Sequence, residues 1–372
     1  MVLKPSLSIF LRALLCIALG FGGGAIAALL HIPLPYMLGS IAITMFAALA
    51  GIPVARPAKV VVLPMRVVLG VLLGSTMTPE LLDRIGALAG SAAMVPIFVI
   101  TATILGTTYY HRVAGYSREE AFFSAVPGGL HVMTNYAEDT GVDIRRVSLA
   151  HALRITFVVI LAPLATKFLM DVPDINVSQT TATFMQMNLR DMVLLIIAGL
   201  VGWLAGRMTG MPGAQMVGPM LASAALHISG ITAAKPPVEI ILMSQVILGA
   251  YIGSRYVGEK LTLVRDSMIY AFGHVVMMLC LGFCFAYMLH IMFDVPVITA
   301  LLSFAPGGMS EIGLIALALG LDVGFVATVQ VSRSITISLL APAAWARIRR
   351  LVVTDDEQNR SSRKTPPEGP PT

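Results

Sequence analysis

Two arginines lie deep in apolar segments, where a charged side chain is costly. Arg154 stands in "LAHALRITFVVI" and Arg333 in "VQVSRSITISLL". An arginine at the centre of a membrane helix costs roughly 2.5–3.5 kcal/mol on insertion scales, so each of these should face protein or water. The residue three positions earlier is polar in both cases, His151 and Gln330, and shares the helix face of its arginine.

Both arginines are candidates for binding an anion, because a guanidinium group holds a carboxylate through two parallel hydrogen bonds. Two other roles stay open for them. Each arginine could hold loop carbonyl groups or a carboxylate in place, or its long side chain could reach the membrane surface.

A Pro-Gly-Gly step occurs twice, in "SAVPGGLHVM" from Ser124 and in "SFAPGGMSEI" from Ser303. Proline and glycine interrupt a helix, and non-helical backbone at membrane depth persists only where protein or a water-filled cavity satisfies it. A new half-helix should begin after each step, at Leu130 and at Met309, and its first free N–H groups can face an anion. The predicted substrate-binding glycines are Gly128, Gly129, Gly307 and Gly308.

Two titratable residues follow these steps. Glu311 is the one acid in "MSEIGLIALALG", and His131 follows the first Pro-Gly-Gly. Glu311 could take up a proton or couple to a cation, and a histidine changes its charge near neutral pH. Each also has a simpler alternative, since Glu311 could stabilise its helix N-terminus and His131 could be structural.

Other charges bear on the sign of the ligand. Arg66 lies within an apolar segment and could line a path or join helices. Glu138 and Asp139 could neutralise the arginines, unless they pair with Arg145 and Arg146 in a loop.

Motifs for catalysis are missing from the sequence, which has no G-x-S-x-G, H-E-x-x-H, Walker or dinucleotide-binding pattern. The three cysteines, Cys16, Cys280 and Cys284, lie in apolar runs with no histidine or carboxylate to complete a metal set. The net charge of +5 is scattered over short loops instead of one face. We therefore expect no enzyme activity, no cofactor, no metal and no nucleic-acid partner.

Composition assigns the chain to the membrane. It is 57% hydrophobic and 12% charged, whereas soluble globular chains carry about 25% charged residues. Apolar runs of about the 20 residues that cross a bilayer recur from end to end. The chain is a predicted polytopic membrane protein.

The segment around the first Pro-Gly-Gly returns 179 residues later. The same offset carries Gly141 to Gly320 and Arg154 to Arg333, and it aligns prolines and glycines from residue 33 onward without a gap. Shared apolar composition alone does not keep turn residues in one register over such a length. The chain is therefore predicted to contain one unit twice. Since residues 8–30 have a partner in the second copy, we expect them to belong to the fold and not to a signal peptide.

Each copy offers five apolar segments besides its Pro-Gly-Gly element, which covers about 119–140 or 297–320. The segments are about 10–30, 35–52, 60–77, 87–110 and 147–169, and then 189–208, 215–230, 238–256, 267–290 and 325–346.

Basic residues indicate how the two copies are oriented. The loop after the fourth segment holds Arg112 and Arg118 in the first copy, whereas "HIMFDVP" in the second has no lysine or arginine. The loop after the third segment has few basic residues in the first copy and is basic in the second. Basic loops face the cytoplasm, so equivalent loops are predicted on opposite sides of the membrane. This requires an odd number of crossings per copy.

The predicted fold is an all-α polytopic membrane protein. It has two inverted repeats of about five transmembrane helices each, with a broken or re-entrant helix at each Pro-Gly-Gly and both termini in the cytoplasm. The first repeat covers residues 1–185 and the second 186–350. Residues 351–372 are polar and proline-rich and are predicted to form a disordered tail.

The segments "AVPGGLHVM", "TGVDIRRVSLAHALR" and "SFAPGGMSEIGLIA" resemble the AbrB-duplication family of bacterial inner-membrane proteins. The resemblance covers nearly all of residues 8–350. It implies the fold and an inner-membrane location. Family members carry labels such as regulator and ammonia monooxygenase, but this chain shows neither a DNA-binding element nor a metal set.

The leading hypothesis for function is a secondary transporter of a small anionic solute, since broken helices in an inverted repeat typify such transporters. The alternative is a membrane-embedded sensor that affects gene expression indirectly. An oxidoreductase subunit would need metal ligands that the sequence lacks. The expected partners are the solute and membrane lipid, and self-association into a homo-oligomer stays open.

Overall fold

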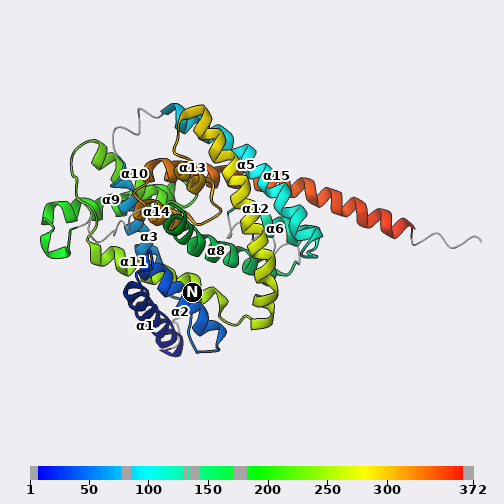
Figure 1. Cartoon of the computed structure of the whole chain (residues 1–372), viewed down its shortest axis with the longest axis horizontal. Coiled ribbons are helices and arrows are strands. Elements are labelled where there is room, and N and C mark those ends of the chain that lie inside the picture. Colours follow the sequence, from blue (N-terminus) through cyan, green and yellow to red (C-terminus); the bar gives the residue numbers. More distant parts are fainter. Residues whose placement is uncertain (1–6, 78–84, 129–132, 134–141, 171–181, 363–372) are drawn as a thin grey trace, which may run out of the picture.

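The computed structural model of the chain is helical, with no strand among the residues it describes (Figure 1). These are residues 7–77, 85–128, 133, 142–170 and 182–362, with side chains described over 8–163 and 182–346 within those ranges. The predicted all-α class is confirmed for this part of the chain.

The helices before residue 171 follow the apolar segments of the first copy. They are α1 (Leu7–Leu29), α2 (Pro35–Leu49), α3 (Lys59–Gly74), α5 (Ile85–Arg112), α6 (Arg118–Ala125) and α8 (Ile144–Met170).

The helices after residue 181 follow the second copy. They are η2 (Phe184–Gln186), α9 (Leu189–Met208), α10 (Ala214–Ile228), α11 (Val238–Gly253), η3 (Ser254–Tyr256), α12 (Leu261–Phe293), α13 (Val297–Phe304), α14 (Met309–Ala318) and α15 (Val323–Ser362).

Seven helical segments are long and apolar enough to cross a membrane, in α1, α5, α8, α9, α11 with η3, α12 and α15. They make the chain a multi-pass membrane protein. The ten predicted spans all contain helices, but α2 and α10 have 15 residues and α3 has 16. At about 1.5 Å per residue these three fall short of the ~30 Å hydrocarbon core. Gly51 and Gly230, both with positive φ, follow α2 and α10 and turn the chain there.

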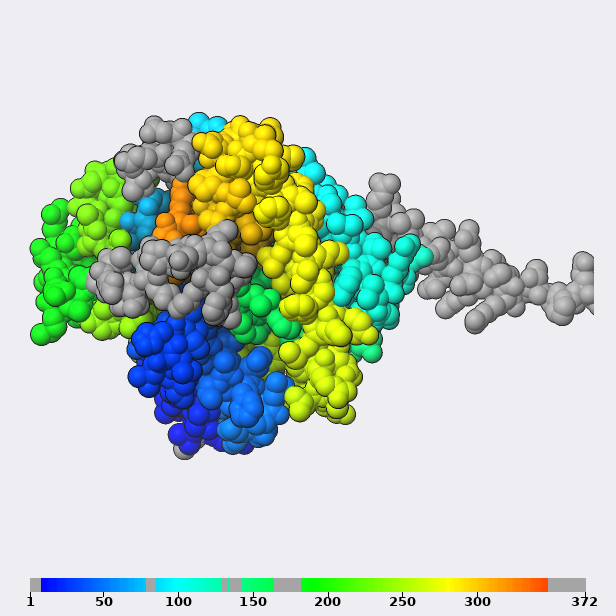
Figure 2. Space-filling view, viewed as in Figure 1, coloured from blue at the N-terminus to red at the C-terminus, as the bar shows by residue number. Residues whose placement is uncertain are grey.

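The long helices differ in how far other helices cover them. In α11, 72% of the apolar window is buried, whereas in α1 only 22% is. Exposed apolar side chains line α12, among them Ile269, Phe272 and Phe283, and the yellow band of α12 runs down the visible face in Figure 2. A continuous exposed apolar surface of this kind marks contact with lipid.

Helix bounds recur at the 179-residue offset. Residues 35–49 of α2 correspond to 214–228 of α10, 59–74 of α3 to 238–253 of α11, and 118–125 of α6 to 297–304 of α13, with identical bounds in each pair. Proline or glycine lies at matching positions near most of these ends. The starts of α6 and α13 differ, since α6 has a Ser117–Glu120 capping box and α13 follows Pro296.

Contacts between the copies recur in exchanged form. A Cβ on Gly70 of α3 would lie 2.5 Å from the carbonyl oxygen of Met216 on α10, and one on Gly249 of α11 would lie 2.7 Å from that of Met37 on α2. Gly249 and Met216 are the offset partners of Gly70 and Met37. Glycine lets both helix pairs approach closely, and the exchange is the contact pattern of a two-fold arrangement.

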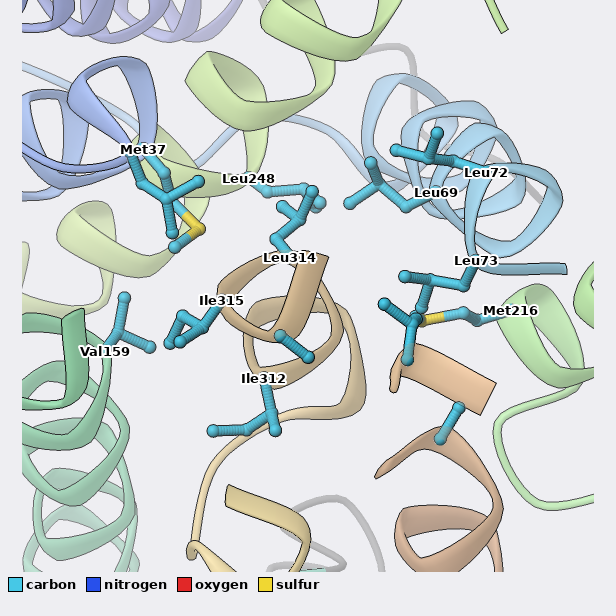
Figure 3. Close-up of a cluster of buried hydrophobic side chains, with 14 of the residues drawn as sticks. Met37, Leu69, Leu72, Leu73, Val159, Met216, Leu248, Ile312, Leu314 and Ile315 are labelled. Carbon is cyan, nitrogen blue, oxygen red and sulfur yellow. The ribbon is translucent and has the colours of Figure 1, made fainter. Parts of the chain in front are cut away.

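The largest hydrophobic cluster surrounds α14, which lies in the middle of Figure 3. Leu314 faces Leu248 of α11, and Ile315 faces Val159 of α8. Because all of these side chains are buried, α14 is held on several sides at once. That position fixes the start of α14, where the second Pro-Gly-Gly ends.

The end of α15 departs from the predicted disordered tail. The helix continues through residues 351–362 to Ser362 and projects from the body of the molecule as the red helix in Figure 1. A helix that already exists extends at little cost, since only its nucleation is unfavourable. Residues 363–372 lie outside the described part of the chain.

Candidate functional site

A cavity of about 550 Å³ opens beside the Pro-Gly-Gly segment Pro306–Gly308. Its size lies within the range of small-molecule sites, roughly 300–1,000 Å³. The walls come from both copies. From the first copy the lining includes Gly128, Arg66 of α3, and His151 and Arg154, both of α8. From the second copy it includes Gln215 (α10), Arg255 (η3), Glu311 (α14), and Gln330 and Arg333 (both α15).

Six of the eight predicted substrate-binding residues line this cavity, namely Gly128, Arg154, Gly307, Gly308, Glu311 and Arg333. The other two, Gly129 and His131, lie outside the described residues, as do Glu138 and Asp139. Residues that are far apart in the sequence therefore share one cavity.

Arg154 holds the end of α6. Its NH1 group donates to the carbonyl oxygen of Val126 at 2.8 Å, and its NH2 group lies 2.7 Å from Nδ1 of His151. Nε2 of that histidine is 2.8 Å from the carbonyl oxygen of Phe123. With Nε2 as donor, the ring accepts at Nδ1 from Arg154, so one tautomer satisfies both contacts.

Arg333 holds the end of α13 in the corresponding way. Its NH1 group donates to the carbonyl oxygen of Ala305 at 2.6 Å, and its NH2 group donates to that of Gly307 at 2.9 Å. NH2 also donates to Oε1 of Gln330, whose Nε2 donates to the carbonyl oxygen of Ser303 at 3.1 Å.

These contacts give both arginines the role of holding carbonyl groups, which the sequence had left open beside anion binding. The last carbonyls of a helix have no partner within it and carry partial negative charge. Each arginine satisfies them where the chain leaves the helix for Pro-Gly-Gly. Both arginines still line the cavity, and they are close enough to repel each other electrostatically.

Local geometry at the two Pro-Gly-Gly steps explains their glycines. Gly128 has φ of 144°, a conformation that side chains rarely allow. Gly308 has an ordinary φ of −74° as the residue before α14, but a Cβ there would overlap the carboxylate of Glu311. The predicted start of a helix at Met309 is confirmed, and Leu130 lies outside the described residues.

Glu311 folds back over the start of α14. Its side chain is 7% exposed, and Oε2 accepts a hydrogen bond from the Ser310 hydroxyl at 3.0 Å. A carboxylate in the first turn of a helix is stabilised by the helix dipole, so the simpler role foreseen for Glu311 is present in the geometry.

Arg66 and Arg255 contribute free cationic groups to the cavity. Their guanidinium carbons lie 5.7 Å and 5.6 Å from the ring centre of Tyr251, and Arg56 lies over the same ring at 5.9 Å. Within the described part of the chain neither Arg66 nor Arg255 has a hydrogen bond or an ion pair. Buried atoms of both, Nε of Arg66 and NH1 of Arg255, have no hydrogen-bond partner there.

Arg255 lines the cavity but was not among the site residues predicted from the sequence. Its offset partner is Thr76, so the repeat gave no signal for it. A signal lay in its position directly after an apolar helix, where η3 turns the chain back against the protein.

The described lining carries four arginines and one glutamate, a formal charge of +3 with histidine neutral. Arg255 and Glu311 attract each other electrostatically. Among the described lining residues, one carboxylate therefore stands against four guanidinium groups.

Comparison with known proteins identifies the family to which the chain belongs. A family model described as transition state regulatory protein AbrB matches residues 56–349. The "Uncharacterized protein YhjN" of Bacillus subtilis is 25% identical over 366 residues, which cover 92% of this chain and 94% of the relative. The "Putative regulator AbrB" of Escherichia coli is 24% identical over 320 residues, which cover 84% and 89%. Because the model match extends over most of the chain, the protein belongs to the AbrB family.

Proposed function

We propose that the protein is a secondary transporter that carries a small anionic solute unchanged across the bacterial inner membrane. The observation that carries this proposal is the cavity with four arginines against one glutamate, next to a broken helix. Secondary transporters bind solutes where interrupted helices meet between two related halves. A charge of this kind is costly in a membrane unless a ligand or water meets it.

The transport proposal includes an inverted arrangement of the halves, with repeats over residues 1–185 and 186–350. Exchanged contacts such as Gly70 with Met216 and Gly249 with Met37 support a two-fold relation. The swap of basic loops between the copies supports an axis in the membrane plane. A two-fold axis in the membrane plane allows one cavity to open alternately to each side of the membrane.

A sensor that reports ligand binding to a partner is the second candidate. The printed name of the Escherichia coli relative, a regulator, favours it. Both functions use the same cavity, but only transport moves the ligand across the membrane.

A binding experiment tests whether the protein binds an anion. The purified protein is unfolded thermally with mono-, di- and tricarboxylates, phosphate and sulfate, and with amines of matched size. We expect at least one anion to raise the midpoint, since a ligand at a hundred times its Kd stabilises by about 2.7 kcal/mol, and we expect no effect of the amines. Stabilisation by amines alone would contradict the anion proposal.

The repeat provides a matched variant. Arg66 has Gln245 as its offset partner, so Arg66→Gln places at this position a residue that the same packing already accepts. Losing a charged hydrogen bond should weaken anion binding by about ten- to a hundredfold, with little change in the unliganded midpoint. Equal affinity in Arg66→Gln would remove this cavity as the binding site.

Uptake separates the transporter from the sensor. Proteoliposomes receive the radiolabelled anion found above, and Arg66→Gln and protein-free liposomes are the controls. Accumulation that needs Arg66 supports transport, whereas tight binding without uptake supports the sensor.

A further inference from the structure

A group of buried polar side chains lies between α5, α6 and α12, beside Arg154. His274, Tyr110 and Ser124 are each at most 1% exposed. Both ring nitrogens of His274 and the hydroxyls of Tyr110 and Ser124 have no hydrogen-bond partner among the described residues. The Tyr110 and His274 ring centres are 4.8 Å apart. We call these three residues the polar cluster.

Leaving such groups unsatisfied costs roughly 1–3 kcal/mol each. Several of them together form the kind of site that holds buried water. Gly106 packs closely on the cluster, since a Cβ there would lie 2.8 Å from Nε2 of His274 and 2.9 Å from Cβ of Ala125. The cluster therefore holds buried polar atoms without partners among the described residues, at a place where the chain has no bulkier side chain.

The matching place in the other half is apolar except for Ser303, the offset partner of Ser124, whose hydroxyl donates to the carbonyl oxygen of Thr299. The offset partners of His274, Gly106, Tyr110 and Ala125 are the buried residues Val95, Phe285, Leu289 and Phe304. Ring centres of Phe285 and Phe304 lie 5.6 Å apart, and Phe98 lies 5.4 Å and 5.0 Å from them. The two halves, alike in Arg154 and Arg333 and in several helix ends, thus differ in this polar region.

One end of the polar cluster lies near cavity residues. Gly106 adjoins both His274 and Ala125, and the carbonyl oxygen of the next residue, Val126, accepts a hydrogen bond from Arg154. His274 is also close enough to His151 and Arg154 for their charges to interact. His151 lines the cavity, whereas its offset partner is Gln330, which cannot titrate. The titratable groups on this side of the cavity therefore come from α8 and α12.

At its other end the cluster reaches the surface. Tyr110 stacks on Tyr116 with ring centres 5.2 Å apart, and Tyr116 interacts with Ser267. Arg146 lies 5.8 Å from the Tyr116 ring and is 44% exposed, near Glu120 and Asp143. Three further titratable groups of the described residues pack here, namely Tyr109 of α5, Tyr270 of α12 and His111, whose Nδ1 lies 2.8 Å from the carbonyl oxygen of Tyr116.

We propose that the polar cluster lines a water-filled proton path from the surface near Tyr116 and Arg146 to His151 at the cavity, and that a proton accompanies the anion. This inference rests on the proposed transport. A proton enters from the surface, is taken up at one imidazole nitrogen and leaves from the other, so no bond other than N–H or O–H changes.

Electrostatic interactions couple the binding of the proton to the binding of the anion. Arg154 repels a protonated imidazole at His274 or His151, and Arg255 adds to the repulsion at His151. Arg66 and Arg333 on the cavity wall act in the same sense, and Glu311 opposes them. An anion in the cavity offsets these positive charges, so each ligand favours the binding of the other.

Accessibility tests the path without knowledge of the solute. In a variant with Cys16, Cys280 and Cys284 replaced by alanine, His274→Cys and the matched Val95→Cys are treated with a small charged methanethiosulfonate in vesicles of both orientations. Arg145→Cys marks the surface near Arg146. We expect His274→Cys to react from the side on which Arg145→Cys reacts, and Val95→Cys to stay unreactive.

Three results would overturn the path: no reaction at His274→Cys, reaction only from the opposite side, or equal reaction at Val95→Cys. Ser124→Cys repeats the test if His274→Cys does not fold, as judged by gel filtration and thermal unfolding.

Proton movement tests the coupling. Proteoliposomes containing pyranine are given the anion identified by thermal unfolding, and we expect the lumen to acidify in the wild type. In His274→Gln the acidification should fall to that of protein-free liposomes. Anion uptake without acidification overturns proton coupling and leaves the transport proposal standing. Absence of uptake contradicts transport, and the thiol experiment still decides whether the path exists.

Discussion

At Arg333 one guanidinium group meets two requirements. It satisfies the carbonyl groups of Ala305 and Gly307, and it places positive charge at the cavity wall. The carbonyls belong to the chain that leaves α13, so the position of Gly307 and Gly308 depends on this side chain. Arg333 is thus a positioning residue as well as a charge.

Replacing Arg333 by lysine should separate these requirements. Lysine keeps the charge but lacks the planar fork that reaches two carbonyls and Gln330. Leaving one buried carbonyl unsatisfied costs about 1–3 kcal/mol, so thermal unfolding of Arg333→Lys should show a lower midpoint, and anion affinity should fall with it. Arg66→Gln is the control that should lose affinity alone. Full stability in Arg333→Lys would show that the carbonyl contacts do not hold the broken helix.

Glu311 is the negative charge among the four arginines of the cavity lining. Removing it in Glu311→Gln should strengthen anion binding by about tenfold, within the roughly 1–4 kcal/mol expected for unit charges 4 Å apart near a protein surface. Calorimetry measures both affinities. Equal affinity in the wild type and in Glu311→Gln would show that this carboxylate does not act on the bound anion.

At the scale of the elements, glycines decide how closely helices cross. Gly23 of α1 and Gly39 of α2 touch through their backbones, and Gly202 and Gly218 repeat the contact between α9 and α10. A methyl group at any of these positions would meet a carbonyl of the facing helix. The crossing therefore depends on residues with no side chain.

Gly23→Ala should lower stability by about 1–3 kcal/mol, because the backbone it meets cannot move aside as a side chain can. Gly22 is the matched control in the same helix, since a Cβ there meets nothing within 4 Å. Gly22→Ala should leave stability unchanged or raise it by up to about 1 kcal/mol, as alanine favours the helix. Thermal unfolding of both variants measures the difference, and equal midpoints would show that the α1–α2 crossing is not tight.

Apolar segments and the positions of proline and glycine predicted the helices, but not all of their lengths. The start of α12 at Leu261 was missed by six residues, because Arg265 and Asp266 in its first turns lower the hydropathy although both are exposed. The extension of α15 through residues 351–362 was missed, because the prediction used the polar composition of the tail and did not consider that the preceding helix could continue into it. Local sequence does not report what a neighbouring element already supplies.

Candidate residues of the site were found where they broke the apolar pattern. Arg154, Arg333 and Glu311 stand out because a charge in an apolar run needs a reason. Arg255 follows an apolar run, so the same signal was absent, and only the fold brings it to the cavity. The polar cluster was invisible for a related reason, since one histidine and one tyrosine in long helices are unremarkable until their unsatisfied atoms are seen together.

At the scale of the whole molecule, the two copies combine likeness with differences, of which the polar cluster is one. Their arginines, helix ends and exchanged glycine contacts correspond, which gives the molecule two related walls around one cavity. The polar cluster exists on one side and aromatic packing on the other. In the transport that we propose, alternate opening uses the likeness of the copies, and coupling to a proton uses the polar cluster.

The inverted orientation makes a prediction about one matched pair of residues. Val113 and Met292 are offset partners, each just beyond the fourth apolar segment of its copy, and they are 56% and 58% exposed. If the copies are inverted, Val113→Cys lies on the cytoplasmic side with Arg112 and Arg118, and Met292→Cys lies on the other side. In the variant without native cysteines, an impermeant maleimide should label Met292→Cys in intact cells and Val113→Cys only in inside-out vesicles. Labelling of both from one side would make the copies parallel, and the proposal of one cavity opening alternately through an in-plane axis would fail with it.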